Sequence, residues 1–389
     1  MIKIGSAIST SDDPAQAVDE VIAQSLGELE GLEAGLAFAF ISADHGDATD
    51  EIVKRLAARL EGVPLIGCTT QATIGNGSEV EQGPALALWV AHLAGATVQP
   101  FSAAIEQTAD GAALMGFPLI EEPVQAAFLL ADPYTFPTQV LLQTLNEDYP
   151  QLPVFGGQAS GAGAGQVALV LNDTILREGA VGILLSGSVE VTPLVSQGCR
   201  PIGEPYVVTA AKGNIIHQLG GKPPLGRLRD IMSKLSRAER AQAAHNLHIG
   251  VVIDERKSDP EPGDFLIRPV LQADPETGAV SVGEVLNVGQ TVQFQVRDAE
   301  TADADLKHML QTHLDSAPEP EVNGALLFTC NGRGSPLFGV PDHDVSVLRD
   351  AIPNIPVAGM FCGGEIGPIG GVNFLHGFTA SIALFRENQ

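Results

Sequence analysis

The sequence predicts an α/β protein made of repeated strand–helix–strand units, with mixed sheets and a hairpin-rich segment between the second and third units. Three observations lead to this prediction. A motif of one proline, two apolar residues and a glycine occurs three times, an amphipathic helical pattern precedes each copy, and a short apolar run precedes each helix. The copies are VPLIG (63–67), LPVFG (152–156) and IPVAG (355–359).

Each repeat is expected to run from a buried strand through a helix to the proline-led strand, then through a glycine-rich loop to a returning strand. The initial runs GLAFAFI, AAFLLA and GALLFT are typical of strands buried on both faces. In DEIVKRLAARL, Ile52, Val53 and Leu56 share one helix face, and TQVLLQTLNEDY and DHDVSVLRDAI repeat the pattern. Proline suits the start of a strand, because its missing N–H falls outside the ladder. The repeats cover residues 35–94, 124–187 and 323–386.

The segment between the second and third repeats has a different pattern. It predicts a hairpin over 206–219, a helix over 226–245, a hairpin over 265–284, a strand over 290–298 and a helix over 302–315. The stretch GGKPPLG, residues 220–226, has the composition of a linker. We therefore expect two domains, residues 1–222 with two repeats and residues 223–389 with the third.

Composition excludes several classes of function. The 389 residues carry a net charge of −26, which disfavours binding to nucleic acids and to anionic membranes. No stretch approaches the roughly 18 unbroken apolar residues of a membrane span, so we expect a cytoplasmic protein. The four cysteines are far apart in sequence and indicate neither a disulfide framework nor a metal site.

The crossover rule indicates where a ligand would bind. Parallel strands of a right-handed crossover end at the same edge of a sheet, and open α/β sheets bind ligands there. In the third repeat this rule brings together TCNGRGSP and the glycine-rich stretch MFCGGEIGPIGG (360–371), which is predicted to be a loop. The predicted ligand-binding residues are Cys330, Asn331, Arg333, Gly334, Cys362, Gly363, Gly364, Glu365 and His376. The same rule gives secondary candidates in the first two repeats: Cys68, Thr69, Gln71, Gly156, Gly157 and Ser160.

Two interpretations of the charged pair in the third repeat stay open. Arg333 could clamp a ligand carboxylate while Glu365 accepts a ligand ammonium, which suits a small zwitterion. Alternatively, the two side chains form an internal salt bridge, or Glu365 accepts hydrogen bonds from its own loop. A thiol enzyme that uses Cys330 or Cys362 is a further alternative, with His376 as the nearby base, although buried thiols usually act as small hydrophobes. No residue is assigned as catalytic.

The segments FTCNGRGSPLFG, GQTVQFQVRD and VAGMFCGGEIGPIGGVNFLHGFTASIALF resemble the C-terminal FIST domain. VPLIGCTTQATIG, LPVFGGQASG and QGCRPIGEPYVVTAAKGNII resemble its N-terminal partner domain. The resemblance implies an intracellular sensor of a small ligand, proposed in the family to include amino acids, that signals through a separate partner protein. It also allows a haem-based nitric oxide sensor. His245 and His248 are three residues apart and are the candidate haem ligands, unless they only mark a helix end.

Overall fold

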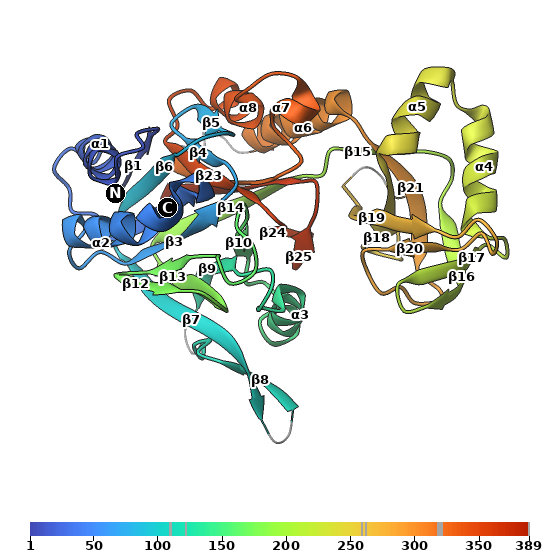
Figure 1. Ribbon diagram of the computed structural model, residues 1–389, viewed down its shortest axis with the longest axis horizontal. Coiled ribbons are helices and arrows are strands. Elements are labelled where there is room, and N and C mark those ends of the chain that lie inside the picture. Colours follow the sequence, from blue (N-terminus) through green and yellow to red (C-terminus); the bar gives the residue numbers. More distant parts are fainter. Residues whose placement is uncertain (109–110, 121–122, 258–259, 261–262, 317–321, 388–389) are drawn as a thin grey trace. The chain divides into compact units, whose positions relative to one another are not determined.

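The computed structural model describes the chain from residue 1 to residue 389, except residues 109–110, 121–122, 258–259, 261–262, 317–321 and 388–389 (Figure 1). The chain forms two compact units, a larger one of Met1–Val195 with Lys307–Gln389 and a smaller one of Ser196–Leu306. Both units combine helices with β-sheets, which confirms the predicted α/β class. None of the described helices is long and apolar enough to cross a membrane.

The larger unit contains three sheets, and each sheet is centred on one repeat (Figure 1). The first strand of the repeat lies between its parallel proline-led strand and its antiparallel returning strand. The order first strand, helix, proline-led strand, returning strand is β2 (Leu36–Ser42), α2 (Thr49–Arg59), β3 (Leu65–Thr70), β6 (Leu86–Leu93) in the first repeat; β9 (Val124–Ala131), α3 (Thr138–Asp148), β10 (Val154–Gln158), β13 (Ala180–Gly187) in the second; and β22 (Gly324–Cys330), α8 (His343–Ala351), β23 (Val357–Cys362), β26 (Ala380–Glu387) in the third.

A short hairpin follows each proline-led strand and pairs with the proline-led strand of a different repeat. Hairpin β4–β5 of the first repeat pairs with β23, β11–β12 of the second pairs with β3, and β24–β25 of the third pairs with β10. The exchange is cyclic, so every sheet contains strands from two repeats. The hairpin strands are β4 (Thr73–Gly75), β5 (Ser78–Val80), β11 (Leu169–Leu171), β12 (Thr174–Leu176), β24 (Glu365–Ile369) and β25 (Val372–His376).

The opposite side of each returning strand pairs with the strand that precedes the repeat in the chain or lies before it. These strands are β1 (Ile2–Ser9), β7 (Ala96–Thr108) and β14 (Val189–Ser196), and β7 also pairs with β8 (Gly111–Met115). The three sheet orders are therefore β1-β6-β2-β3-β11-β12, β8-β7-β13-β9-β10-β24-β25 and β14-β26-β22-β23-β4-β5. Helix α1 (Pro14–Gly27), the 3₁₀ helix η1 (Ala43–Ala48) and the short α7 (Ser335–Phe338) complete the unit, which receives the C-terminal half of α6 (Ala299–Ser316).

The glycine of each proline-led strand occupies the same register position. Gly67 lies opposite Ala39, Gly156 opposite Leu129 and Gly359 opposite Leu327 of the parallel partner strand. A Cβ atom added at these glycines would lie 2.2, 2.0 and 1.8 Å from the partner's carbonyl oxygen. The parallel strands therefore approach each other too closely for any side chain, which explains why the motif ends in glycine.

Aromatic side chains from all three sheets meet in one central core. Phe38 of the first sheet contacts Phe128 of the second with ring centroids 5.3 Å apart, and Phe128 stacks on Phe385 of the third at 5.6 Å. Trp89 of the first sheet lies 4.8 Å from Phe385. The outer face of the first sheet packs against α1 and α2, and that of the second against α3. Each sheet is thus buried on both faces, as the continuous apolar runs predict.

The smaller unit contains a sheet that closes on itself. Its order is β15-β21-β16-β17-β20-β19-β18, and β18 also pairs with β21. The predicted linker 220–226 lies inside this unit, between a strand and a helix. The elements are β15 (Cys199–Pro201), β16 (Tyr206–Lys212), β17 (Ile215–Leu219), α4 (Pro224–Lys234), α5 (Arg237–His245), β18 (Leu247–Val252), β19 (Phe265–Ala273), β20 (Val280–Val282) and β21 (Thr291–Arg297).

Two local predictions were wrong. The helix expected over 226–245 is two helices, because Ser236 and Glu239 form a capping box that starts α5 afresh. The stretch 360–371 is not a loop, since it holds the end of β23 and all of β24. Its glycines serve close packing: a Cβ at Gly367 would lie 2.4 Å from Ser381 Oγ.

Gly359→Ala should destabilise the larger unit by about 1–3 kcal/mol or more, because the added methyl group overlaps the Leu327 carbonyl. Urea unfolding followed by the fluorescence of Trp89, the single tryptophan, measures this loss. Gly27→Ala is the matched control, since nothing lies within 4 Å of a Cβ there and the residue ends a helix. Equal stabilities of the two variants would contradict the close-approach explanation.

Candidate functional site

The carboxyl ends of β22 and β23 lie side by side, as the crossover rule requires. The two strands are parallel, Cys330 is in register with Cys362, and the Asn331 N–H donates to the Cys362 carbonyl at 3.1 Å. The segments that contain Arg333 and Glu365 both begin at this third edge. Their charged side chains, however, are fully buried, at 0% exposure each.

Arg333 forms a bidentate ion pair with Asp344 of α8. Its Nε and Nη2 atoms donate to the two carboxylate oxygens at 2.6 and 2.8 Å, and Thr329 Oγ1 donates to the same carboxylate. The guanidinium carbon lies 5.2 Å from the ring centre of Phe338, which stacks on His343. Burial would raise the pKa of Asp344, but the Arg333 charge and the hydrogen bonds from its neighbours outweigh burial and hold that pKa below its usual value.

Two carboxylates of the exchanged hairpin β4–β5 cover this edge. Glu79 Oε1 accepts from the Val345 N–H at 2.9 Å, and Glu81 Oε1 accepts from the N–H and hydroxyl of Ser335. Glu79 is 5% exposed, and its Oε2 accepts no hydrogen bond from the described residues. Burial, with the negative charge of Asp344, raises the pKa of Glu79 to about 8. The folded chain therefore keeps a proton on Glu79 at neutral pH.

Glu365 lies in β24 rather than in a loop. Its Oε2 accepts from the N–H and hydroxyl of Thr379 at 3.0 and 2.8 Å. His376 is its cross-strand neighbour, with Nε2 2.8 Å from the Gly367 carbonyl oxygen. These contacts fix both ends of the hairpin. A ligand role for Arg333 and Glu365 stays a prediction, and it requires that both side chains become accessible.

The remaining glycines and polar residues predicted for these edges take part in backbone contacts between repeats. The Gly363 N–H donates to Gln158 O, the Gly364 carbonyl accepts from Gln158 N–H, and Gly157 leaves room for Cys362 Sγ. Ser160 Oγ donates to the Phe361 carbonyl at 2.5 Å and accepts from the Gln71 N–H at 2.9 Å. Ser160 therefore joins all three repeats at one point. Gly334, at φ 74°, precedes α7 and lies against Glu81.

The thiols differ in exposure. Cys68 and Cys362 are fully buried, and burial raises the pKa of both thiols well above the usual range. A buried thiol with a raised pKa is a poor nucleophile. Cys330 is half-buried at the end of β22. The thiol-enzyme alternative therefore draws no support from Cys362.

The histidines considered for haem do not form a helical pair. Helix α5 ends at His245, whereas His248 lies in strand β18. His248 is 6% exposed, its Nδ1 faces the Asn246 carbonyl at 2.9 Å, and burial lowers its pKa. This arrangement does not fit an axial ligand that projects into a porphyrin slot. Within the described ranges, no group of three or more His, Cys, Asp or Glu side chains is placed to hold a metal ion.

The first edge, at the carboxyl ends of β2 and β3, contains an open pocket of ≈ 570 Å³, here called the first-edge pocket. Its walls come from the first repeat and from the loop of the second repeat that precedes β11. Three charged side chains reach it, and Thr69 is the one predicted residue among its lining. The lining residues are Ala43, Gly46, Asp47, Thr49, Asp50, Thr69, Gly161, Ala162, Gly165, Gln166 and Arg177.

Charges in the first-edge pocket are of both signs. Arg177 Nη2 lies 2.6 Å from Asp50 Oδ1, with the two side chains 47% and 54% exposed. The pocket also faces the start of α2, where Ala48 provides no side-chain cap for the first N–H groups. Unlike Arg333, Arg177 can exchange its carboxylate partner for a ligand without opening the core. Sequence reasoning missed Arg177, Asp47 and Asp50.

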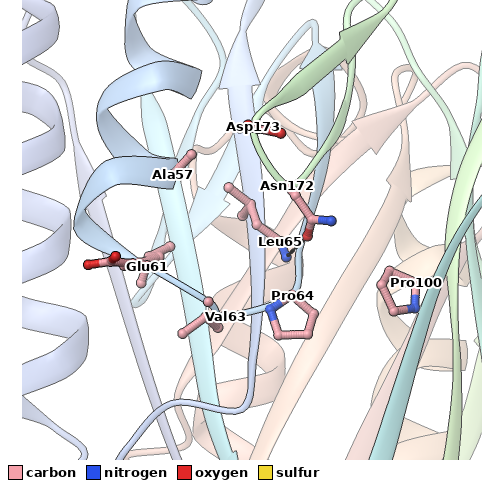
Figure 2. Close-up of a pocket in the computed structure, with 10 residues that line it drawn as sticks. Ala57, Glu61, Val63, Pro64, Leu65, Pro100, Asn172 and Asp173 are labelled. Atoms are coloured by element: carbon pink, nitrogen blue, oxygen red, sulfur yellow. Dashed lines mark hydrogen bonds between the residues drawn. The ribbon is translucent and has the colours of Figure 1, made fainter.

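A second cavity of ≈ 400 Å³ lies at the opposite end of β3 (Figure 2). Val63, Pro64, Leu65 and Pro100 make its walls largely apolar (Figure 2), and its charged lining residues are the acidic Glu61 and Asp173. Neither this cavity nor the first-edge pocket is lined by Arg333 or Glu365. Of the two, the first-edge pocket offers a cation and carboxylates together.

Comparison with known proteins gives a consistent family. The chain matches the FIST N domain over residues 35–222 and the FIST C domain over residues 225–368. It is 44% identical over 387 residues to an uncharacterised protein of Mycobacterium tuberculosis, covering 99% of this chain and 100% of the relative. An uncharacterised protein of Mycobacterium bovis is 44% identical over the full length of both. An F-box/LRR-repeat protein of Arabidopsis thaliana is 33% identical over 88 residues, which are 22% of this chain and 17% of that protein.

Arg333→Ala should cost about 3–5 kcal/mol of unfolding free energy, because it leaves the buried Asp344 carboxylate without its guanidinium. Asp344→Ala should cost a similar amount, and the double variant less than the sum. Arg55→Ala is the control, since its pair with Glu51 is about half exposed and should be worth under about 1 kcal/mol. Urea unfolding of the four variants tests this. Fully additive losses would contradict a coupled pair.

Glu79→Gln should flatten the pH dependence of stability. The pKa of Glu79 is about 8 in the folded chain and 4.5 as its ordinary value, so the folded state binds this proton more tightly. Stability from Glu79 is therefore full below pH 4.5 and falls by about 1.4 kcal/mol per pH unit until the pH passes about 8.

Urea unfolding of wild type, Glu79→Gln and the exposed-site control Glu51→Gln at several pH values in this window measures the slope. The wild type and the control should lose stability in parallel, and Glu79→Gln should lose about 1.4 kcal/mol per pH unit less. Identical slopes for all three proteins would show that Glu79 is already ionised in the folded chain.

Proposed function

Because the chain belongs to the FIST family, whose domains are associated with small-ligand sensing and signalling, we propose that it senses a small zwitterion such as an amino acid. The ligand binds in the first-edge pocket. The single observation that carries this proposal is that an open pocket of ≈ 570 Å³ holds a cation and two carboxylates at the carboxyl end of a parallel strand pair.

Arg177 is the group that receives the ligand carboxylate. Its planar fork suits bidentate binding, and its present partner, Asp50, is a solvent-exposed side chain that can be displaced at small cost. The first N–H groups of α2 favour the same negative charge. Asp50, released from Arg177, and Asp47 then receive the ligand ammonium. The pocket therefore matches both charges of a zwitterion.

The first edge suits this role better than the third edge. At the third edge Arg333 is fully buried and its fork is held by Asp344, so a ligand would have to disrupt a buried ion pair. At the first edge the ligand replaces a surface pair. Signalling then proceeds through a separate output protein, and the pocket is placed to influence such a partner because its loop continues into Ser160, which touches the other repeats.

Calorimetric titration of an amino-acid panel tests the proposal. Arg177→Gln and Asp50→Asn should each weaken binding tenfold or more, because each removes a charge-assisted contact worth about 1.5–3 kcal/mol. Arg55→Gln is the matched control, as Arg55 belongs to an ion pair of similar exposure on the same helix but outside the pocket lining.

The titration separates the possible results. The proposal is abandoned if wild type binds no member of the panel, or if Arg55→Gln weakens binding as much as Arg177→Gln. Binding that survives Arg177→Gln but is lost in folded Glu365→Gln would move the site to the third edge.

A further inference from the structure

The negative charge of this protein is distributed very unevenly. Residues 196–306 contain 12 Lys and Arg and 15 Asp and Glu, a net charge of −3, so the rest of the chain carries −23 of the total −26. Within the smaller unit, residues 222–240 contain six Lys and Arg against two Asp and Glu. This stretch, which includes α4 and the start of α5, is net positive by four charges in a strongly acidic protein.

Five cations of this stretch are exposed, and we call them the α4–α5 patch: Lys222, Arg229, Lys234, Arg237 and Arg240. None of the five forms an ion pair with any residue that the structure describes. By contrast, at least six of the nine Lys and Arg residues of the larger unit are ion-paired. Unpaired cations are thus concentrated on one surface despite an excess of carboxylates elsewhere.

The inner side of the two helices is already used in packing. Ile231 and Ala243 are buried, α4 packs on β17 and α5 on β21 (Figure 1). Arg227 is not part of the patch, because its guanidinium donates to the carbonyls of Leu219 and Gly220. Glu239 caps the start of α5 through Ser236. The outward side therefore keeps its positive charge, with half-buried apolar side chains between the cations.

We propose that the α4–α5 patch is a docking surface for an acidic polypeptide segment of a separate protein. Charge complementarity identifies the partner as anionic. Residues 222–240 contain no aromatic residue, so the surface has no platform on which bases could stack. The −23 charge of the larger unit repels a long phosphate polymer or an anionic bilayer, whereas a short acidic segment needs only local contacts within a Debye length of about 8 Å.

Half-buried Leu228, Met232 and Leu235 strengthen the choice of a polypeptide. They lie among the arginines and offer apolar contacts to side chains between the carboxylates of a partner. The proposal does not depend on the first-edge pocket, and it holds whether or not that pocket binds an amino acid.

Fluorescence anisotropy with the full chain and a labelled 12-residue oligoglutamate tests the proposal, at low salt and again at physiological salt. Arg229→Glu with Arg237→Glu should weaken binding at least tenfold. Lys54→Glu with Arg55→Glu, an equal charge change on exposed positions of α2, should change it less than about twofold. Arg229→Gln with Arg237→Gln gives an intermediate loss and guards against misfolding of the reversed variant, which circular dichroism checks.

A single-stranded RNA of equal charge and phosphatidylserine vesicles are titrated alongside. The proposal stands if oligoglutamate binds more tightly than both and the loss is specific to the patch variants. It is overturned if oligoglutamate does not bind, if both charge-reversal pairs weaken binding equally, or if RNA or vesicles bind more tightly than the peptide.

Discussion

The larger unit depends on the pairing of each proline-led strand with a hairpin from another repeat. Without its borrowed hairpin, a repeat is a three-stranded sheet with an open edge on the proline-led strand, and such edges are unstable in isolation. The exchange closes that edge three times with one rule. It also builds every ligand-accessible strand edge from two repeats, so the chemistry of an edge is never set by one segment of sequence.

This arrangement explains why equivalent edges differ. At the third edge, the borrowed hairpin brings Glu79 and Glu81 over α7 and α8, and the charges beneath it are buried and paired. At the first edge, the borrowed segment brings glycines and Arg177, which leaves an open pocket with a displaceable ion pair. Burial turns one set of charges into a structural element, and exposure keeps the other available for binding.

Local pattern was sufficient to predict the strand–helix–strand units, the two hairpins and the helix of the middle segment, because apolar periodicity reflects burial directly. It also placed the segments that hold Arg333 and Glu365 at one edge, through the parallel pairing of β22 and β23. The hairpins were beyond its reach, since β4 and β11 are three residues long and their partners lie far away in the chain. For the same reason Arg177 was missed, because it reaches the first edge only through that exchange. The glycines of 360–371 were misread as flexibility, whereas Gly367 meets Ser381 in a packed interior.

The cyclic exchange sets the order in which the chain can fold during synthesis. The first sheet lacks its last two strands until residues 169–176 emerge, and the second sheet lacks its own until residues 365–376 emerge, near the end of the chain. Contacts such as Cys68 with Met360, 292 residues apart, give the unit a high contact order, which slows folding. The smaller unit, by contrast, is one uninterrupted stretch and can form while the larger unit still waits for its final hairpin. For most of its synthesis, the chain therefore exposes unfinished sheet edges that chaperones would have to protect.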